Sequence, residues 1–287
     1  MDREIRRVAV LGAGTMGHGI AQVAAMAGYH VALRDTTDAL VRQGLARIRQ
    51  NLDDGVMRGK VQFETRADAL GRLAGHTDLG EAVRDADLVI EAVPEKFQLK
   101  VDVLHEVEAL APAHALVATN TSSLSITDLQ ETTRRPGRVV GLHFFNPVHI
   151  MKLVEVVRGR KTDESVVDAA VAFASRLGKE PIVVNDAPGF ASSRLGIALG
   201  LEAMRMVEEG VASPEAIDKA MELGYRHPMG PLRLTDLVGL DVRLDIANYL
   251  YEALGTERFR PPEILKRLVA EGKLGRKTGQ GFYTWED

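Results

Sequence analysis

A histidine and a glutamate twelve residues apart are the side chains best suited to acid–base chemistry in this sequence. His143 is predicted to lie in a loop that follows an apolar strand over 138–142, and Glu155 lies inside a second strand rich in valine. Burying that carboxylate without a partner would be costly. An imidazole beside it would be such a partner and would act as a general acid and base. The alternative is a solvated loop histidine and an edge-strand glutamate.

A glycine-rich loop near the amino terminus has the sequence context of a dinucleotide-binding βαβ unit. Apolar patterns predict a strand over 8–11, a helix over 20–27 and a second strand over 30–33. The loop after the first strand is Gly12-Ala13-Gly14-Thr15-Met16-Gly17. Its first glycine permits a tight turn, its second lets the backbone approach a pyrophosphate, and its third lets helix and strand pack closely.

Asp35 follows the second of these strands and bears on the choice of nicotinamide cofactor. Its carboxylate would accept hydrogen bonds from the adenosine ribose hydroxyls and would repel a 2′-phosphate. The sequence therefore predicts NAD as the cofactor. The adjacent Arg34 is the feature that would suit NADP.

Polar residues follow several of the apolar strands that come later in the chain. Such strands are predicted over 88–93, 115–119 and 181–184. Ligands of doubly wound sheets bind beyond the carboxyl ends of the strands. We therefore expect Glu95, Asn120 and Ser122 to lie with His143 where a nicotinamide meets its substrate. Helix capping is the alternative role for Ser122.

The predicted fold is α/β, with a Rossmann-like, doubly wound and mostly parallel sheet that carries a helical hairpin insertion over about 38–73. An all-α domain follows. A turn-forming cluster at 185–189 marks the boundary. It divides the chain into an NAD-binding domain, 1–185, and a helical substrate and dimerisation domain, 186–287. The insertion is net positive, which would attract a phosphorylated substrate tail, although a solvated helical face would have the same composition.

Composition excludes several classes of protein. The 287 residues suffice for one large or two ordinary domains. A net charge of -4 argues against a nucleic-acid binder, and the absence of cysteine excludes disulfides and thiolate catalysis. No apolar run reaches eighteen residues, so no membrane span is expected. We predict a cytoplasmic enzyme without a metal site.

The whole chain resembles the short-chain L-3-hydroxyacyl-CoA dehydrogenase family, of the bacterial 3-hydroxybutyryl-CoA dehydrogenase type. The glycine loop contributes to this resemblance, but more specific motifs carry it. These are Ala118-Thr119-Asn120-Thr121-Ser122-Ser123-Leu124, Gly141-Leu142-His143-Phe144-Phe145-Asn146-Pro147, Met151-Lys152-Leu153-Val154-Glu155-Val156, Asp186-Ala187-Pro188-Gly189-Phe190, Pro228-Met229-Gly230-Pro231, Gly239-Leu240-Asp241 and Gly275-Arg276-Lys277-Thr278-Gly279-Gln280-Gly281-Phe282-Tyr283.

The resemblance implies a role for each matched residue. His143 would be the catalytic base, Glu155 its orienting carboxylate, and Ser122 a hydrogen-bond donor to the reacting oxygen. Besides the glycine loop and Asn120, the implied cofactor contacts are Asp35, Glu95, Lys100, Asn146 and Lys277. The implied coenzyme A contacts are Asn51, Arg58 and Lys60. Ser193 stands where the family usually has a catalytic asparagine, and serine is shorter and lacks the second amide donor. We expect activity to survive this change.

The expected reaction is interconversion of an (S)-3-hydroxyacyl-CoA, foremost 3-hydroxybutyryl-CoA, and the 3-ketoacyl-CoA by hydride transfer to or from NAD. The family implies a homodimer. Two other functions remain open at this point. One is oxidation of a free hydroxy acid, as in an L-gulonate 3-dehydrogenase, and the other is NAD binding without catalysis, as in a crystallin-like protein.

Overall fold

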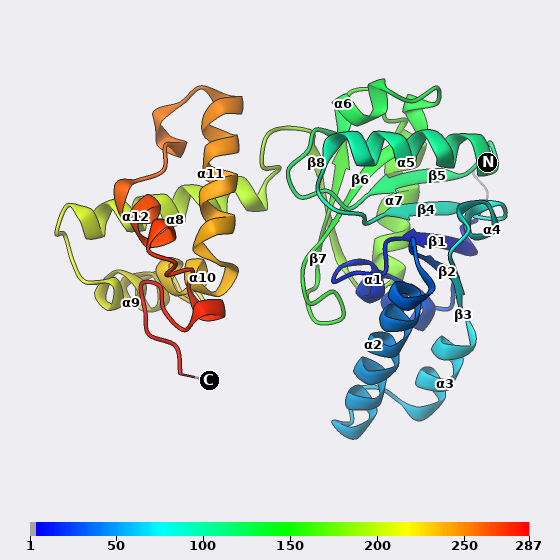
Figure 1. Ribbon diagram of the computed structural model, residues 1–287, viewed down its shortest axis with the longest axis horizontal. Coiled ribbons are helices and arrows are strands. Elements are labelled where there is room, and N and C mark those ends of the chain that lie inside the picture. Colours follow the sequence, from blue (N-terminus) through cyan, green and yellow to red (C-terminus); the bar gives the residue numbers. More distant parts are fainter. Residues whose placement is uncertain (1–3, 287) are drawn as a thin grey trace. The chain divides into compact units, whose positions relative to one another are not determined.

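A computed structural model describes residues 4–286 of the chain. One eight-stranded sheet organises the amino-terminal part, with the strand order β3-β2-β1-β4-β5-β6-β7-β8 (Figure 1). The strands are β1 (Arg7–Leu11), β2 (His30–Arg34), β3 (Leu73–His76), β4 (Leu88–Glu91), β5 (Leu116–Thr119), β6 (Val139–Phe144), β7 (Leu153–Arg158) and β8 (Glu180–Asn185). Six of the seven described strand pairs are parallel, and β6 and β7 run antiparallel. The predicted mostly parallel sheet is confirmed.

The helices of this part connect the strands and include the predicted insertion. They are α1 (Gly17–Met26), α2 (Asp38–Met57), α3 (Phe63–Gly71), α4 (Leu79–Val83), α5 (Phe97–Leu110), α6 (Ile126–Glu131), the 3-10 turn η1 (Pro136–Arg138) and α7 (Glu164–Arg176). Helices α2 and α3 form a hairpin that projects from the sheet (Figure 1). The hairpin ends at Gly71 and β3 begins at Leu73, so the helix predicted to reach residue 73 is two residues too long. The sequence patterns gave no expectation for α4, α6 or α7.

The central strands of the sheet are apolar and buried on both faces, which explains why they form its core. Every residue of β4, β5 and β6 is buried, as is typical of parallel strands between two layers of helices. The core between them is made of aliphatic and aromatic side chains from strands and helices alike, among them Val10, Ile20, Ile90, Leu142, Val154 and Phe173. The order of the strands along the chain reverses between β1 and β4. This reversal opens a crevice at the carboxyl ends of the strands in doubly wound sheets.

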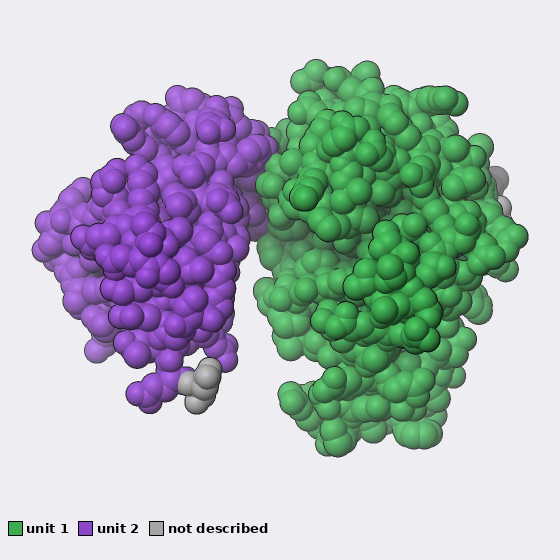
Figure 2. All heavy atoms as spheres, in the orientation of Figure 1, with its two compact units in different colours: residues 1–187 green, residues 188–287 purple. Residues whose placement is uncertain are grey.

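The chain divides into two compact units, residues 1–187 and 188–287, which Figure 2 colours separately. The division falls two residues beyond the predicted boundary. Asp186 lies on the first-unit side, where its Oδ2 accepts hydrogen bonds from Ser125 Oγ and Thr127 N, both at 2.8 Å. These contacts hold the end of the first unit to the start of α6.

The second unit is helical, as predicted. Its helices are α8 (Ser192–Glu208), α9 (Pro214–Gly224), α10 (Pro231–Val238), α11 (Leu240–Leu254) and α12 (Glu263–Ala270), with the 3-10 turns η2 (Glu257–Phe259) and η3 (Arg276–Thr278). Ser213 caps α9 by accepting a hydrogen bond from Ala216 N at 3.3 Å. Gly239 separates α10 from α11 with a φ of 108°, which glycine adopts without strain. Among residues 4–286, no helix is long and apolar enough to cross a membrane.

Candidate active site

His143 and Glu155 face each other across the antiparallel pair β6–β7, in register. The distance from His143 Nδ1 to Glu155 Oε2 is 2.7 Å. Glu155 is fully buried and His143 is 6% exposed. The expected contact therefore exists, but the prediction of a loop histidine is wrong because β6 continues through Phe144. The edge-strand alternative for the glutamate is also wrong, since β7 lies between β6 and β8.

The arrangement around the imidazole suits a general acid and base. The Glu155 carboxylate accepts a hydrogen bond from Nδ1–H and so fixes the tautomer and the orientation of the ring. The Phe145 ring packs on the imidazole with centroids 4.5 Å apart and a tilt of 50°. His143 lies near the carboxyl end of β6. Because β6 is parallel to β5, this end lies beside the carboxyl end of β5, where ligands of this architecture bind.

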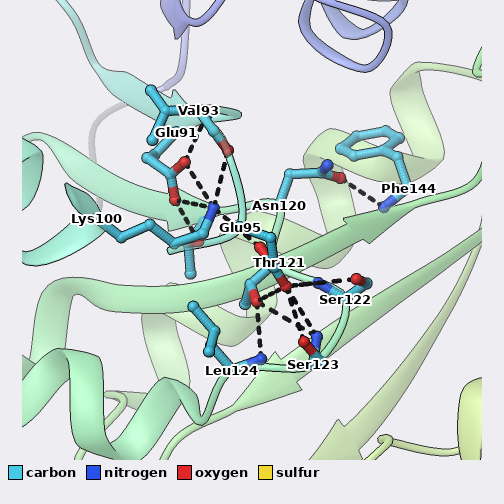
Figure 3. A network of polar contacts seen from close by, with 11 residues as sticks. Glu91, Val93, Glu95, Lys100, Asn120, Thr121, Ser122, Ser123, Leu124 and Phe144 are labelled. Atoms are coloured by element: carbon cyan, nitrogen blue, oxygen red, sulfur yellow. Dashed lines mark hydrogen bonds and ion pairs between the residues drawn. The ribbon is translucent and has the colours of Figure 1, made fainter. Parts of the chain in front are cut away.

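Asn120 joins the end of β5 to the histidine strand. Its Oδ1 accepts a hydrogen bond from Phe144 N at 2.9 Å, directly beside His143 (Figure 3). Asn120 N in turn donates to Glu91 O at the end of β4. The carboxyl ends of β4, β5 and β6 are thereby tied together. Figure 3 shows Asn120 beside Glu95 and the turn that carries Ser122.

Ser122 lies in an exposed turn that folds onto the carboxylate of Glu95 (Figure 3). Glu95 Oε1 accepts from Thr121 Oγ1 at 2.6 Å, Ser122 N at 2.9 Å and Ser123 N at 3.1 Å. Ser122 Oγ is 3.4 Å from the same oxygen. The helix that follows is capped by Ser125, whose Oγ accepts from Asp128 N, so capping is not the role of Ser122.

The charge of this carboxylate is stabilised by its neighbours. Burial alone would raise the pKa of Glu95, but the Lys100 ammonium and hydrogen bonds from Thr121 and Ser122 outweigh burial and lower the pKa. Lys100 Nζ lies 3.2 Å from Glu95 Oε2 and 2.8 Å from Glu91 Oε1. Lys100 is only 1% exposed, whereas Glu95, which it contacts, is exposed.

The glycine loop has the geometry that a dinucleotide requires. Gly12 has a φ of 102°, and a Cβ on Gly17 would lie 1.7 Å from Gly12 O, so a side chain fits at neither position. A Cβ on Gly14 would meet nothing within 4 Å, which leaves that backbone open to a ligand. Helix α1 begins at Gly17 without a side-chain cap on Met16, so no side chain competes for its first N–H groups. Thr15 is exposed between these glycines.

Asp35 belongs to the same loop structure. Its Oδ2 accepts a hydrogen bond from Ala13 N at 2.7 Å and its Oδ1 accepts from Thr36 N at 2.7 Å. The carboxylate is thus fixed at the end of β2, beside the glycine loop. Thr36 Oγ1 also donates to Oδ1 at 3.3 Å, so Oδ2 is the oxygen that keeps acceptor capacity for a further donor.

The remaining predicted residues lie on α2 and the turn after it, just after β6, and in the second unit. Asn51 Nδ2 donates to Gln22 Oε1 at 3.1 Å, which joins α2 to α1. Arg58 and Lys60 are exposed where α2 ends, and Asn146 is exposed after β6. Ser193 lies in the first turn of α8. Lys277 is in η3, with its Nζ 2.6 Å from Asp241 Oδ1.

Glu91 was not identified from the sequence, although it contacts Lys100 and the end of β5. It is the last residue of β4 and fully buried, and Thr119 lies beside it in register on β5. The signal was present, because Glu91 is a carboxylate within the apolar run 88–93, as Glu155 is within its own strand. Reading both glutamates by the same rule would have found it.

Comparison with known proteins gives consistent results. The model of the 3-hydroxyacyl-CoA dehydrogenase NAD-binding domain matches residues 7–187, and the C-terminal domain model of the same family matches 189–285. The chain is 43% identical over 284 residues to the probable 3-hydroxybutyryl-CoA dehydrogenase of Bacillus subtilis, and the match spans 99% of each protein. It is 44% identical to the 3-hydroxybutyryl-CoA dehydrogenase of Mycobacterium tuberculosis over 287 residues, 99% of this chain and 100% of that protein.

Solved structures agree with these matches. The crystal structure of (S)-3-hydroxybutyryl-CoA dehydrogenase from Ralstonia eutropha superimposes with a TM-score of 0.96 at 42% identity, covering 99% of this chain and 100% of the other. The first unit thus corresponds to a domain family that binds NAD, and the predicted family is confirmed. The chain belongs to the 3-hydroxyacyl-CoA dehydrogenase family, and it is an oxidoreductase.

Proposed function

We propose that the protein interconverts (S)-3-hydroxyacyl-CoA and 3-ketoacyl-CoA with NAD, and that the four-carbon 3-hydroxybutyryl thioester is among its substrates. The observation that carries the proposal is the 2.7 Å contact between His143 and the fully buried Glu155 at the carboxyl edge of the sheet. The names of the relatives, which include several 3-hydroxybutyryl-CoA dehydrogenases, support the choice of substrate.

His143 moves the proton of the reaction. During oxidation its Nε2 accepts the proton of the 3-hydroxyl group, and the resulting imidazolium is stabilised by ionised Glu155 through Nδ1. During reduction the same nitrogen returns the proton to the developing alkoxide. The Ser122 hydroxyl is the second donor to that oxygen, and a donor aimed at a developing negative charge lowers the barrier.

NAD, when bound, supplies the acceptor or donor of the hydride. The glycine loop from Gly12 to Gly17 would hold its pyrophosphate, with Thr15 and Met16 beside it, and Asp35 would hold the adenosine ribose. The remaining residues that we assign to the cofactor are Glu95, Asn120, Asn146 and Lys277. Lys100, which is 1% exposed, would act on the cofactor only through Glu95 and not by the direct contact that the resemblance implies. Asp35 favours NAD over NADP because its carboxylate would repel a 2′-phosphate.

The substrate extends beyond the reacting carbon. Asn51, Arg58 and Lys60, on the net positive insertion, are our candidates for contacts with coenzyme A, whose phosphates favour a basic surface. Ser193 would contact the acyl portion in place of the usual asparagine. A homodimer and a cytoplasmic location stay predictions.

One assay tests the proposal directly. NADH consumption is followed spectroscopically with acetoacetyl-CoA, then with longer 3-ketoacyl thioesters, and the series is repeated with NADPH. Turnover of acetoacetyl-CoA with a clear preference for NADH is the expected result. Oxidation of gulonate in the absence of any acyl-CoA turnover would favour a hydroxy-acid dehydrogenase. Tight NADH binding without turnover of any of these compounds would instead indicate a cofactor-binding protein without this activity.

A further inference from the structure

Glu91 is a fully buried carboxylate with every acceptor position in use. Its Oε1 accepts from Lys100 Nζ at 2.8 Å and from Val93 N at 2.7 Å. Its Oε2 accepts from Lys100 Nζ at 3.0 Å and from Thr119 Oγ1 at 2.6 Å. A buried charge with this many donors is held in one position, because any other position would leave a polar group unpaired.

Lys100 is held just as completely. It comes from the first turn of α5, and its side chain reaches the carboxylate of Glu91, the last residue of β4 (Figure 3). Besides both oxygens of Glu91, its Nζ contacts Val93 O at 3.3 Å and Glu95 Oε2 at 3.2 Å. Lysine is a flexible side chain with an ammonium that rotates freely. Here the bidentate contact with Glu91 removes that freedom and directs the ammonium at Glu95.

The third carboxylate in this sequence of contacts carries the turn with Ser122. Four groups from residues 121–123 donate to Glu95 Oε1 at 3.1 Å or less. Figure 3 shows Glu91, Lys100, Glu95 and the Ser122 turn in continuous contact. The path leads from a residue without any exposed surface to a serine that is exposed at the edge of the sheet.

We propose that Glu91 is a positioning residue for the reaction, acting through Lys100 and Glu95 on the Ser122 hydroxyl. We call Glu91, Lys100 and Glu95 the charge chain. Glu91 anchors the ammonium, the ammonium fixes one oxygen of Glu95, and the other oxygen holds the turn. The part of this inference that concerns turnover rests on the proposed function, because it needs Ser122 to contact the reacting oxygen.

The alternative is that Glu91 only fastens β4 to β5 and α5. Such a role would change the stability of the fold and leave the Ser122 turn and the rate unaltered. Asp87 provides a matched control, since it is a buried carboxylate that directly precedes β4, whereas Glu91 is the last residue of that strand. Asp87 is 4% exposed, and its Oδ2 accepts from Arg6 N at 2.9 Å and from Arg7 N at 3.0 Å.

The experiment compares Glu91→Gln with Asp87→Asn in the full chain. The first readout is amide hydrogen exchange at Ser122 and Ser123, measured by NMR in the protein without added cofactor. We expect exchange about fivefold faster in Glu91→Gln, because the hydrogen bonds to Glu95 weaken, and unchanged in Asp87→Asn. The readout requires no activity, so it tests the charge chain even if acetoacetyl-CoA is not a substrate.

The second readout is steady-state kinetics with acetoacetyl-CoA and NADH. A donor removed outright from a developing oxyanion costs about 10²–10³ in kcat, so a displaced donor should cost about tenfold. We expect this loss in kcat with KM for acetoacetyl-CoA changed by less than about twofold, since the contact matters mainly in the transition state. Asp87→Asn should keep the kcat of the unaltered protein.

The double variant Glu91→Gln, Lys100→Met covers the case in which Glu91→Gln does not fold. It removes both buried charges together, so neither is left unpaired. The same faster exchange and lower kcat are expected, because Glu95 has lost the ammonium that fixes it. Exchange at Ser122 and Ser123 and a kcat that both match those of Asp87→Asn, in whichever of these variants folds, would overturn the proposal.

Discussion

Two buried glutamates of the same sheet have partners of different chemistry. Glu155 on β7 faces His143, and Glu91 on β4 holds Lys100, and both carboxylates are fully buried. Histidine exchanges a proton near neutral pH, whereas lysine keeps its charge unless it is desolvated without a partner. The first pair is therefore suited to proton transfer and the second to fixing geometry.

Exposure separates the two pairs further. His143 is 6% exposed and contacts Glu155 through Nδ1. Lys100 is 1% exposed and its ammonium is surrounded by three acceptor groups: Glu91, Glu95 and Val93 O. A buried carboxylate by itself therefore does not identify a catalytic group. The decisive feature is the chemistry of the partner, because an imidazole exchanges a proton near neutral pH and a paired ammonium does not.

The largest effect should come from removing the titrating partner. His143→Ala is expected to lower kcat by about 10²–10⁴-fold, the usual contribution of one positioned general acid or base. NADH affinity should stay within about twofold, because the imidazole is assigned to the substrate. Steady-state kinetics and fluorescence titration with NADH measure the two quantities. His105→Ala, at an exposed histidine of α5, is the control. A kcat near that of the control would remove His143 from the mechanism.

Removing the fixed cation should act on stability first. Lys100→Met leaves Glu91 buried without its counter-charge, which typically costs about 3–5 kcal/mol. The double variant with Glu91→Gln should recover most of that loss, since the carboxylate that lacked its counter-charge is then replaced by a neutral amide. Urea denaturation of the two variants and the unaltered protein measures the difference. Equal unfolding free energies for the single and double variants would mean that the buried pair is not coupled.

The catalytic pair should respond differently to loss of its anion. Glu155→Gln keeps the shape and a hydrogen-bond acceptor but removes the charge that stabilises the imidazolium. We expect kcat to fall by roughly 10²-fold, less than the largest losses known for such orienting carboxylates. Steady-state kinetics with acetoacetyl-CoA and NADH measure the change. A kcat equal to that of the unaltered protein would show that the contact does not operate during turnover.

Much of the fold followed from apolar patterns. Short apolar runs predicted strands at 8–11, 30–33 and 115–119, and the structure has strands there. The change from alternating strands and helices to helices alone predicted two units, and the chain divides into two. Short helices were missed, since α4 and α6 span only one or two turns and leave little periodicity to detect. His143 was predicted to follow a strand that ended at Leu142, whereas β6 includes both the histidine and Phe144.

The site was predicted in part, and the reason lies in how each contact is formed. The pairing of His143 with Glu155 was foreseeable, because a carboxylate in a valine-rich strand requires a partner. The position of Lys100 was not foreseeable. It depends on how α5 packs against β4 and on which oxygen of Glu95 the ammonium contacts. Side-chain direction across two packed elements has no signature in sequence spacing.

The smallest expected effect tests the exposed end of the charge chain. The pKa of Glu95 in the folded protein lies below its ordinary value, since the opposing effect of burial is outweighed by Lys100 and by donors from residues 121 and 122. The unfolded chain then binds the proton more readily, so the stability that Glu95 contributes is present above the ordinary glutamate range. It is lost as pH falls through the lowered value.

Glu95→Gln should therefore make the unfolding free energy depend less steeply on pH in the acid range. Urea denaturation at several pH values between about 7 and 3 measures the slope. Glu106→Gln, at an exposed carboxylate of α5, should keep the slope of the unaltered protein. Equal slopes for the two variants would mean that Lys100 does not stabilise the charged form of Glu95. The charge chain would then stop at the contact between Glu91 and Lys100. The His143–Glu155 contact would remain as the link between a buried carboxylate and the edge where substrate is expected.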